Sequence, residues 1–160
     1  YTMSPKLSHL CMYAAAQASI NPDCNPDTIS REFCRRVWGS EHEILGELFE
    51  AFEVVPAWGF YPRRQWSKQE AHRAYLKIIE HLEQANTDKC ELPLFPSPAQ
   101  YHRDVLWFAK LFAKLSEPDS DREVIRKEYW KRCLSIYDHI PMSVDERAEM
   151  AAKGFSQIFA

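Results

Sequence analysis

Apolar side chains recur every three or four residues along most of this chain, which is the period of an amphipathic α-helix. The clearest stripes are Ala71, Ala74, Tyr75, Ile78, Ile79 and Leu82, and then Tyr101, Val105, Phe108, Phe112 and Leu115. Shorter stripes are Leu7, Leu10, Cys11 and Ala14; Ile29, Phe33 and Val37; Ile44, Leu45, Leu48, Phe49 and Phe52; Val124, Ile125, Tyr129, Cys133, Ile136 and Tyr137; and Ala148, Ala151, Phe155 and Ile158. The pattern predicts an all-α fold: one domain over residues 1–160, built as a bundle of about six to seven helices.

Residues typical of helix starts stand in front of these stripes. Capping boxes occur at Ser40-x-x-Glu43, Ser67-x-x-Glu70, Ser120-x-x-Glu123 and Ser143-x-x-Glu146. Capping residues precede proline at Ser4-Pro5, Asn25-Pro26 and Ser97-Pro98. In a box the Ser oxygen accepts from an N–H of the first turn, and the Glu accepts from the Ser N–H. Proline in the first turn has a helical φ and no N–H to leave unpaired.

These signals divide the chain into helices and connectors. The expected helices cover residues 5–19, 26–38, 41–55, 68–86, 98–115, 121–140 and 144–159. Gly39 should end the second helix, and the prolines at 56, 118 and 141 should end later ones. The connector over 87–97, with Pro93 and Pro96, is the one place where the pattern suggests an internal boundary.

Length and charge narrow the classes of protein. With 160 residues, 46% of them hydrophobic, the chain can bury a core without a metal or a disulfide. A net charge of −3 argues against nucleic acid or an anionic membrane as a partner. No apolar run approaches the roughly 18 residues that span a bilayer. Because the chain begins at Tyr1 rather than Met, we expect a domain cut from a longer protein, and the compartment is not indicated.

The cysteines form no C-x-x-C motif, and their number is odd. They are Cys11, Cys24, Cys34, Cys90 and Cys133. Disulfide frameworks usually show an even number of cysteines in a shorter chain. The sequence therefore favours buried free thiols, although it leaves open a bridge between Cys24 and Cys34.

No catalytic or cofactor motif is present. None of His9, His42, His72, His81, His102 and His139 belongs to an H-E-x-x-H motif, a zinc-type Cys/His spacing or a Glu-x-x-His motif. Only 4 glycines occur, which argues against loops that cradle phosphates. Most of the 23 Asp and Glu residues lie on solvated faces or in first helical turns. We expect no metal, no cofactor and no complete active site in this segment, with histidines at the surface or hydrogen-bonded in the core.

The stretch over 55–66 is the best candidate for a working surface. It combines aromatic rings with arginines, and the candidate residues are Trp58, Phe60, Tyr61, Arg63, Arg64 and Trp66. Such rings stack on sugars or fill a partner's groove, and arginines pair with carboxylates. The alternatives are that the rings close one end of the bundle, or that they contact another domain.

Two segments carry a resemblance. From Tyr13 to Gly39 the chain has a helix with small residues, an Asn21-Pro22-Asp23 loop, and a second helix ending in an aromatic residue and glycine. It resembles a pattern found after the catalytic barrel in bacterial glycoside hydrolases, including the α-glucuronidase-like and N-acetylglucosaminidase-like groups. The segment from Tyr129 to Asp138 looks like later helices of such C-terminal domains. The resemblance implies a helical domain that follows a (β/α)₈ barrel, whose catalytic carboxylates lie outside this segment.

The resemblance implies a non-catalytic accessory domain of a carbohydrate-active enzyme. Such a domain would buttress the catalytic domain of the same polypeptide, and its 55–66 loop would shape the cleft and contact glycan. One alternative is a stand-alone helical module that binds a protein partner through an exposed apolar patch. A further alternative is a small metal- or cofactor-binding helical enzyme, which would carry stoichiometric metal.

Overall fold

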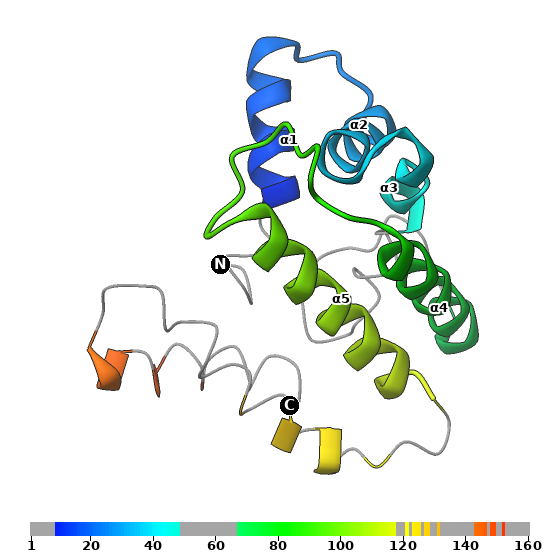
Figure 1. The fold of residues 1–160 in the computed structure, drawn as a ribbon, viewed down its shortest axis with the longest axis vertical. Helices are drawn as coiled ribbons and strands as arrows, with labels where there is room; N and C mark the ends of the chain where they lie inside the picture. The colour runs from blue at the N-terminus through cyan, green and yellow to red at the C-terminus, as the bar shows by residue number, and fades with distance from the viewer. Residues whose placement is uncertain are drawn as a thin grey trace.

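The computed structural model describes residues 9–48 and 67–117, together with positions 121, 123–125, 127–128, 131, 143–146, 148–149 and 152. The described residues form helices joined by turns and loops, and no strand occurs among them (Figure 1). The predicted all-α class is confirmed. The start signal at Ser4 and the whole of the 55–66 stretch lie outside the described residues.

The first two helices contact each other and are joined by a short loop. Helix α1 covers His9–Ile20 and α2 covers Pro26–Trp38, so the second predicted helix is confirmed at both ends. The backbone N–H of Ile29 donates to Asn25 O at 3.1 Å, as expected where a helix begins after Asn25. No residue of α1 is buried. The prediction that Cys11 faces inward is wrong, because only one side of α1 rests on α2.

The chain turns sharply after α2. Gly39 has a φ of 103°, which a residue with a side chain rarely adopts, so it ends the helix as predicted. The prediction that Ser40 caps an α-helix is wrong. Ser40 instead opens a 3₁₀ turn, η1, over Ser40–His42, whose N-cap position is taken by Gly39. The tighter turn carries His42 into the interior, and α3 begins only at Leu45, covering Leu45–Leu48.

Close packing of α3 on α2 explains that delayed start. A Cβ added to Gly46 would lie 2.5 Å from Arg31 N and 2.6 Å from Ser30 C, so the two backbones nearly touch. Leu45 is fully buried, whereas Ile44, expected to point inward with it, is exposed. The close approach of Gly46 therefore sets which side of this segment faces the core.

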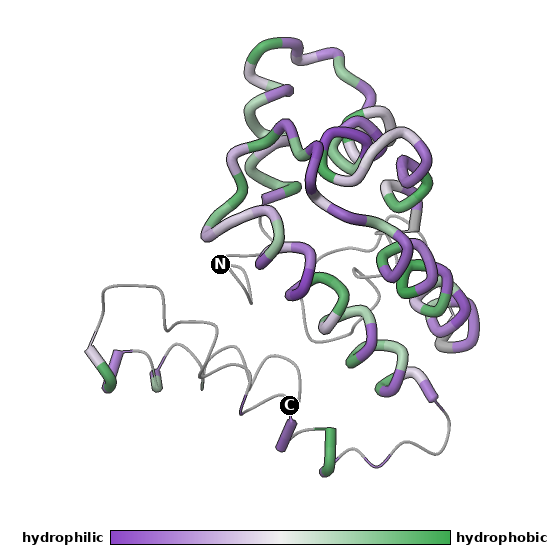
Figure 2. The backbone as a smooth tube through the Cα atoms, viewed as in Figure 1, coloured by the Kyte–Doolittle hydropathy of each residue, from purple (hydrophilic) through white to green (hydrophobic). Residues whose placement is uncertain are grey.

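Helices α4 and α5 lie side by side and supply much of the core (Figure 1). Helix α4 covers Lys68–Gln84 and begins with the predicted capping box, in which Ser67 Oγ accepts from Glu70 N at 3.2 Å and Glu70 Oε2 accepts from Ser67 N at 2.7 Å. Helix α5 covers Pro98–Leu115, and Ser97 Oγ accepts from Gln100 N. Both helices turn polar residues outward and apolar residues toward each other (Figure 2).

One buried cluster joins α2, α3, α4 and α5. Its largest fully buried side chains are Phe33, Val37, Leu45, Tyr75, Ile78, Leu82, Tyr101, Val105, Phe108 and Phe112. Each such side chain stabilises the fold by roughly 1.5–3 kcal/mol through burial. The predicted stripes over 71–82 and 101–115 thus point inward, although Ile79 and Leu115 are only partly buried and pack against the edge of the cluster.

The later helix starts fall partly within the described residues. Asp121 Oδ1 accepts from Glu123 N at 3.0 Å and from Val124 N at 3.2 Å, as an N-cap side chain does, whereas Ser120, which leads the predicted box, lies outside the described residues. A carboxylate accepts these N–H bonds as well as a hydroxyl does. The box at Ser143 is confirmed, with Glu146 N donating to Ser143 Oγ at 3.2 Å. Ile125 joins the core as predicted, while Val124 is exposed.

The cysteines among the described residues are free thiols. Cys34 is fully buried, Cys24 and Cys90 are half-buried, and Cys11 is exposed. The prediction of free thiols is confirmed for these residues and leaves no bridge between Cys24 and Cys34. The expectation that all of them are buried is wrong for Cys11, which is exposed on α1. Cys133 lies outside the described residues.

Candidate functional site

The structure does not place the surface that the sequence singled out. All of its candidate residues lie outside the described residues, namely Trp58, Phe60, Tyr61, Arg63, Arg64 and Trp66. Their role as a ligand or domain contact stays a prediction. Among the described residues, a different feature offers room for a ligand.

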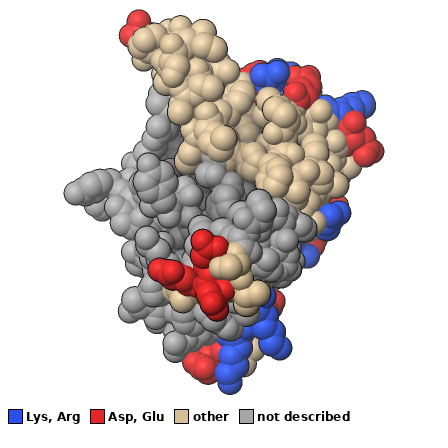
Figure 3. Space-filling model, turned by 90° about the vertical axis from the view of Figure 1, so that its left-hand side faces the viewer, with Lys and Arg blue, Asp and Glu red and all other residues tan. Residues whose placement is uncertain are grey.

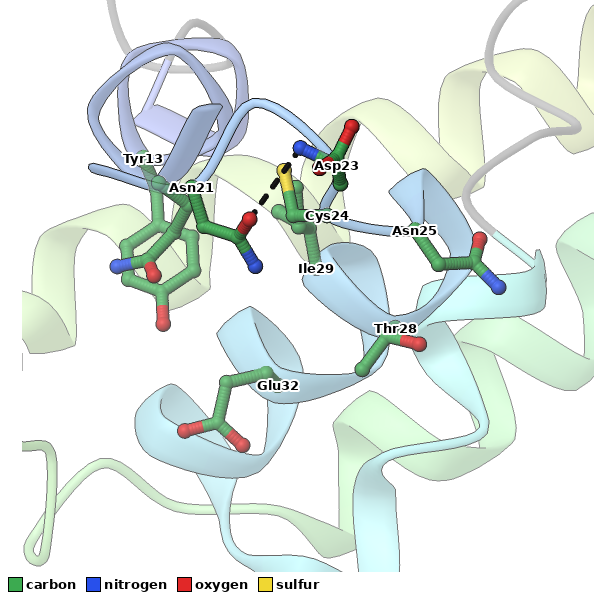
Figure 4. A pocket seen from close by; sticks show the side chains of 9 residues that line it. Tyr13, Asn21, Asp23, Cys24, Asn25, Thr28, Ile29 and Glu32 are labelled. Carbon is green, nitrogen blue, oxygen red and sulfur yellow. Dashed lines mark hydrogen bonds between the residues drawn. The ribbon is translucent and has the colours of Figure 1, made fainter. Parts of the chain in front are cut away.

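A pocket of about 290 Å³ lies between α1, the loop after it and the first turns of α2 (Figure 4). It is lined by Tyr13, Gln17, Asn21, Asp23, Cys24, Asn25, Thr28, Ile29 and Glu32. Tyr13 and Gln17 come from α1, and Glu32 comes from α2. Most of these side chains carry a hydroxyl, an amide or a carboxylate, so the pocket is suited to a small polar ligand.

Hydrogen bonds within the loop hold its shape. Asn21 N donates to Gln17 O at 2.9 Å and so extends the hydrogen bonding of α1 by one residue. Asn21 then accepts twice, through its side-chain Oδ1 from Asp23 N at 3.2 Å and through its carbonyl oxygen from Cys24 N at 3.1 Å (Figure 4). Asparagine is well suited to such a turn because its side chain can mimic a backbone carbonyl. The loop therefore presents Asp23 and Cys24 in a defined position.

Two arginines on α2, Arg35 and Arg36, set the charge at the end of the pocket that Glu32 lines. Arg35 donates to both carboxylate oxygens of Glu32, at 2.9 and 2.7 Å, and this pairing lowers the pKa of Glu32. Arg36 lies over the Tyr13 ring, with its Cζ 6.0 Å from the ring centroid, and donates to Glu91 at 3.1 Å. Because Glu32 is already neutralised by Arg35, the pocket is polar rather than strongly acidic.

The described histidines make specific contacts within the fold. His72 Nδ1 lies 2.9 Å from Ala113 O, His102 Nδ1 accepts from Trp38 Nε1 at 3.0 Å, and His9 Nε2 accepts from Phe95 N at 3.0 Å. Within the described part of the chain, no three His, Cys, Asp or Glu side chains lie together as the ligands of a metal ion would. None of the described helices combines the length and apolar character that crossing a bilayer requires.

Sequence reasoning did not select the pocket residues as a site. The sequence does contain a polar stripe. Tyr13, Gln17 and Asn21 follow one another at four-residue intervals, which place them on one side of α1 and of the turn that continues it. What the pattern did not show was that α2 would lie against this face. In the sequence, the loop between the two helices carries the Asn25-Pro26 helix start and the Asn21-Pro22-Asp23 part of the resemblance, and neither predicts a pocket.

Comparison with known proteins adds no relative. No protein-family model, no curated protein and no solved structure matches the chain. The resemblance of the Tyr13–Gly39 segment to glycoside hydrolase domains therefore stays a prediction.

Proposed function

We propose that this chain is a non-catalytic helical accessory domain of a carbohydrate-active enzyme, and that its partner is the catalytic domain of the same polypeptide. The observation that supports it most is the pocket between α1 and α2, which is lined by the segment that resembles glycosidase C-terminal domains. Its hydroxyl, amide and carboxylate groups lie beside the Tyr13 ring, and such a combination binds sugar hydroxyls.

The pocket offers binding groups more readily than catalytic ones. Glycoside hydrolysis needs a pair of carboxyl groups, one of them able to hold a proton near neutral pH. Here the Arg35 guanidinium lowers the pKa of Glu32, which suits a carboxylate that accepts hydrogen bonds and not one that donates a proton. This favours a role in binding or positioning, with the chemistry carried out elsewhere in the parent enzyme.

Nuclear magnetic resonance titration of the chain with monosaccharides tests the proposal. Glucuronic acid, N-acetylglucosamine and xylose are suitable probes, read through the side-chain amide signals of Gln17 and Asn21. We expect saturable shifts with at least one sugar, and we expect Gln17→Ala to weaken binding about tenfold, as the loss of one good hydrogen bond would. Gln84→Ala, an exposed change at the end of α4, is the matched control and should leave binding unchanged. Saturable binding that Gln17→Ala leaves intact would place the ligand elsewhere.

An exposed apolar surface favours a second function, a module that docks on a protein. Helix α1 contains no Asp, Glu, Lys or Arg, and its Met12 and Ile20 are 66% and 80% exposed. Figure 3 shows the side of the molecule on which α1 lies; in its upper part, charged side chains of the described residues lie at the top and along one edge, and further charged groups lie lower down. Exposed apolar side chains on an uncharged helix are a feature of interaction sites when they form one patch.

The two functions differ in how the chain behaves in solution. A docking module should self-associate or capture a partner, and Met12→Glu should abolish that association. Leu76→Glu, at a half-exposed apolar position on α4, is the control. A chain that stays monomeric in sedimentation at high concentration, and whose parent reading frame encodes an upstream barrel with paired carboxylates, would favour the accessory domain instead.

A further inference from the structure

Two contacts link three histidines from three different elements near the end of α2: His42 packs against His81, and His102 accepts a hydrogen bond from Trp38, the last residue of α2. His42 belongs to η1, His81 to α4 and His102 to α5. The ring centroids of His42 and His81 lie 5.7 Å apart with the planes at 89°, and the charge of His42 acts on His102. These rings connect the turn after α2 to both long helices.

The bond between Trp38 and His102 determines the protonation state of His102. An indole N–H can only donate, so His102 Nδ1, 3.0 Å from Trp38 Nε1, must carry a lone pair and no proton. His102 is therefore neutral in this arrangement, with its proton on Nε2. Protonation would turn Nδ1 into a donor facing another donor. Trp38 is also buried and stacked on Tyr101, at 5.9 Å between ring centroids, so it has little room to turn away.

Like His102, His42 lies in surroundings that disfavour its protonated form. It is 7% exposed, and its Nδ1 has no hydrogen-bond partner within the part of the chain that the structure describes. Burial lowers its pKa, and the nearby His81 lowers it further, while Glu41 opposes the change. A proton added to His42 would place a charge and an additional donor in an apolar site.

The charged groups around His42 and His102 do little to offset the lowering of their pKa values by burial. His42 faces Glu41 on its own turn, His81 on α4 and His102 on α5. Burial lowers the pKa of His102, and the positive Arg103 and His42 add to that effect. Among the described residues, Glu41 is the anionic group that acts on His42, whereas His81 opposes protonation of His42 and Arg103 opposes that of His102.

We propose that His42, His81 and His102 form an acid-sensitive latch that holds η1 and α3 against α4 and α5 at neutral pH and releases them in mildly acidic solution. This device is independent of the proposed function, because it involves neither the pocket nor the surface of α1. In acid, Trp38 loses its acceptor and the rings repel one another.

The direction of the pH dependence follows from proton linkage. A histidine with its pKa lowered in the folded state binds fewer protons there than in the unfolded state. The folded state loses stability as pH falls below the ordinary histidine pKa of 6.5, and the loss continues until the lowered pKa is reached. For each such histidine the folding equilibrium constant falls by up to about tenfold per pH unit in that window.

Two other histidines show why the loss of stability in acid should come from His42 and His102 and not from every histidine. His72 Nδ1 lies 2.9 Å from Ala113 O, and a carbonyl oxygen only accepts, so Nδ1 donates and this contact, unlike that of His102, does not require a bare Nδ1. His9 accepts from Phe95 N, but the contact is exposed, and water can replace an acceptor lost there. His72 is therefore the matched control, since it lies on α4 as His81 does.

Urea unfolding of the 160-residue chain at about pH 7.5 and about pH 5.5 tests the latch. In the double variant, His42→Phe keeps an aromatic ring without a titrating nitrogen, and His102→Asn keeps an acceptor near the position of Nδ1. We expect the folding constant of the unaltered chain to fall by up to about a hundredfold between these pH values. The double variant should lose most of this fall, and His72→Gln should retain it. An equal fall in the double variant and the unaltered chain would overturn the proposal.

A spectroscopic measurement covers the case in which the double variant does not fold. In the unaltered chain, ring ¹⁵N shifts should show His102 with a bare Nδ1 at neutral pH. The Trp38 indole N–H signal should shift or exchange faster as the pH falls below about 6.5. A His102 ring that titrates at or above 6.5 while the Trp38 signal stays unchanged would refute the latch.

Discussion

Replacing Gly46 with alanine tests the packing of α3 on α2 most directly. The added Cβ would lie 2.5 Å from Arg31 N, against about 3.4 Å for an ordinary contact, so the helices must separate by about 0.9 Å. The obstacle is backbone, which cannot rotate aside as a side chain can. Gly46→Ala should therefore move α3 as a unit.

The size of the effect can be worked from two opposing terms. Overpacking a close contact costs about 1–3 kcal/mol, and the backbone contact at Gly46 puts this site at the upper end. Alanine favours a helix over glycine by about 1 kcal/mol, which offsets part of the cost. We expect a net loss of about 2 kcal/mol in the free energy of unfolding, or a fall of about 4–8 °C in melting temperature.

Calorimetry and urea unfolding of Gly46→Ala beside Glu47→Ala provide the measurement. Glu47 is the next residue of α3 and forms an ion pair with Arg31 that is largely exposed. Its loss should cost no more than about 0.5 kcal/mol, because solvent screens such pairs. A Gly46→Ala chain as stable as the unaltered one, or more stable, would show that the helices do not approach as closely as the structure has them.

Three further outcomes follow from the described contacts. Ser67→Ala removes the cap of α4 and should cost about 1 kcal/mol in urea unfolding; no loss would mean that the box contributes nothing. Arg35 lowers the pKa of Glu32, so stability from this partly exposed pair should be lost as pH falls below 4.5, by no more than about 0.5 kcal/mol, and a Glu32→Gln chain should lack that change. Burial raises the pKa of Cys34 while Cys11 is exposed, so brief alkylation followed by mass spectrometry should label Cys11 first; equal labelling would contradict the structure.

Local sequence signals predicted the long helices well because their causes are local. The box at Ser67 and the cap at Ser97 connect atoms three residues apart, and the stripes on α4 and α5 repeat at the helical period. The same reasoning failed at Ser40, where the residues of a capping box are present but the chain forms a 3₁₀ turn. A motif supplies the groups that can form the hydrogen bonds, and the surrounding packing decides whether those bonds form.

The candidate site, too, could be predicted only in part from the sequence. The sequence contained the polar residues of the pocket but not the packing of α1 on α2 that brings Tyr13 and Glu32 to one cavity. The outward face of α1 was also unforeseen, because a stripe that includes Cys11 looks apolar whether or not another helix covers it. Burial depends on neighbours that are distant along the chain.

By itself, the sequence determined that this protein is all-α and where most of its described helices begin and end, because capping and helical periodicity act within a few residues. Only the tertiary structure decided which faces meet. It brought Trp38 to His102, 64 residues away, enclosed His42 in the interior, and set Gly46 against the backbone of α2. These outcomes rest on contacts between segments far apart in the chain, and no local pattern specifies them.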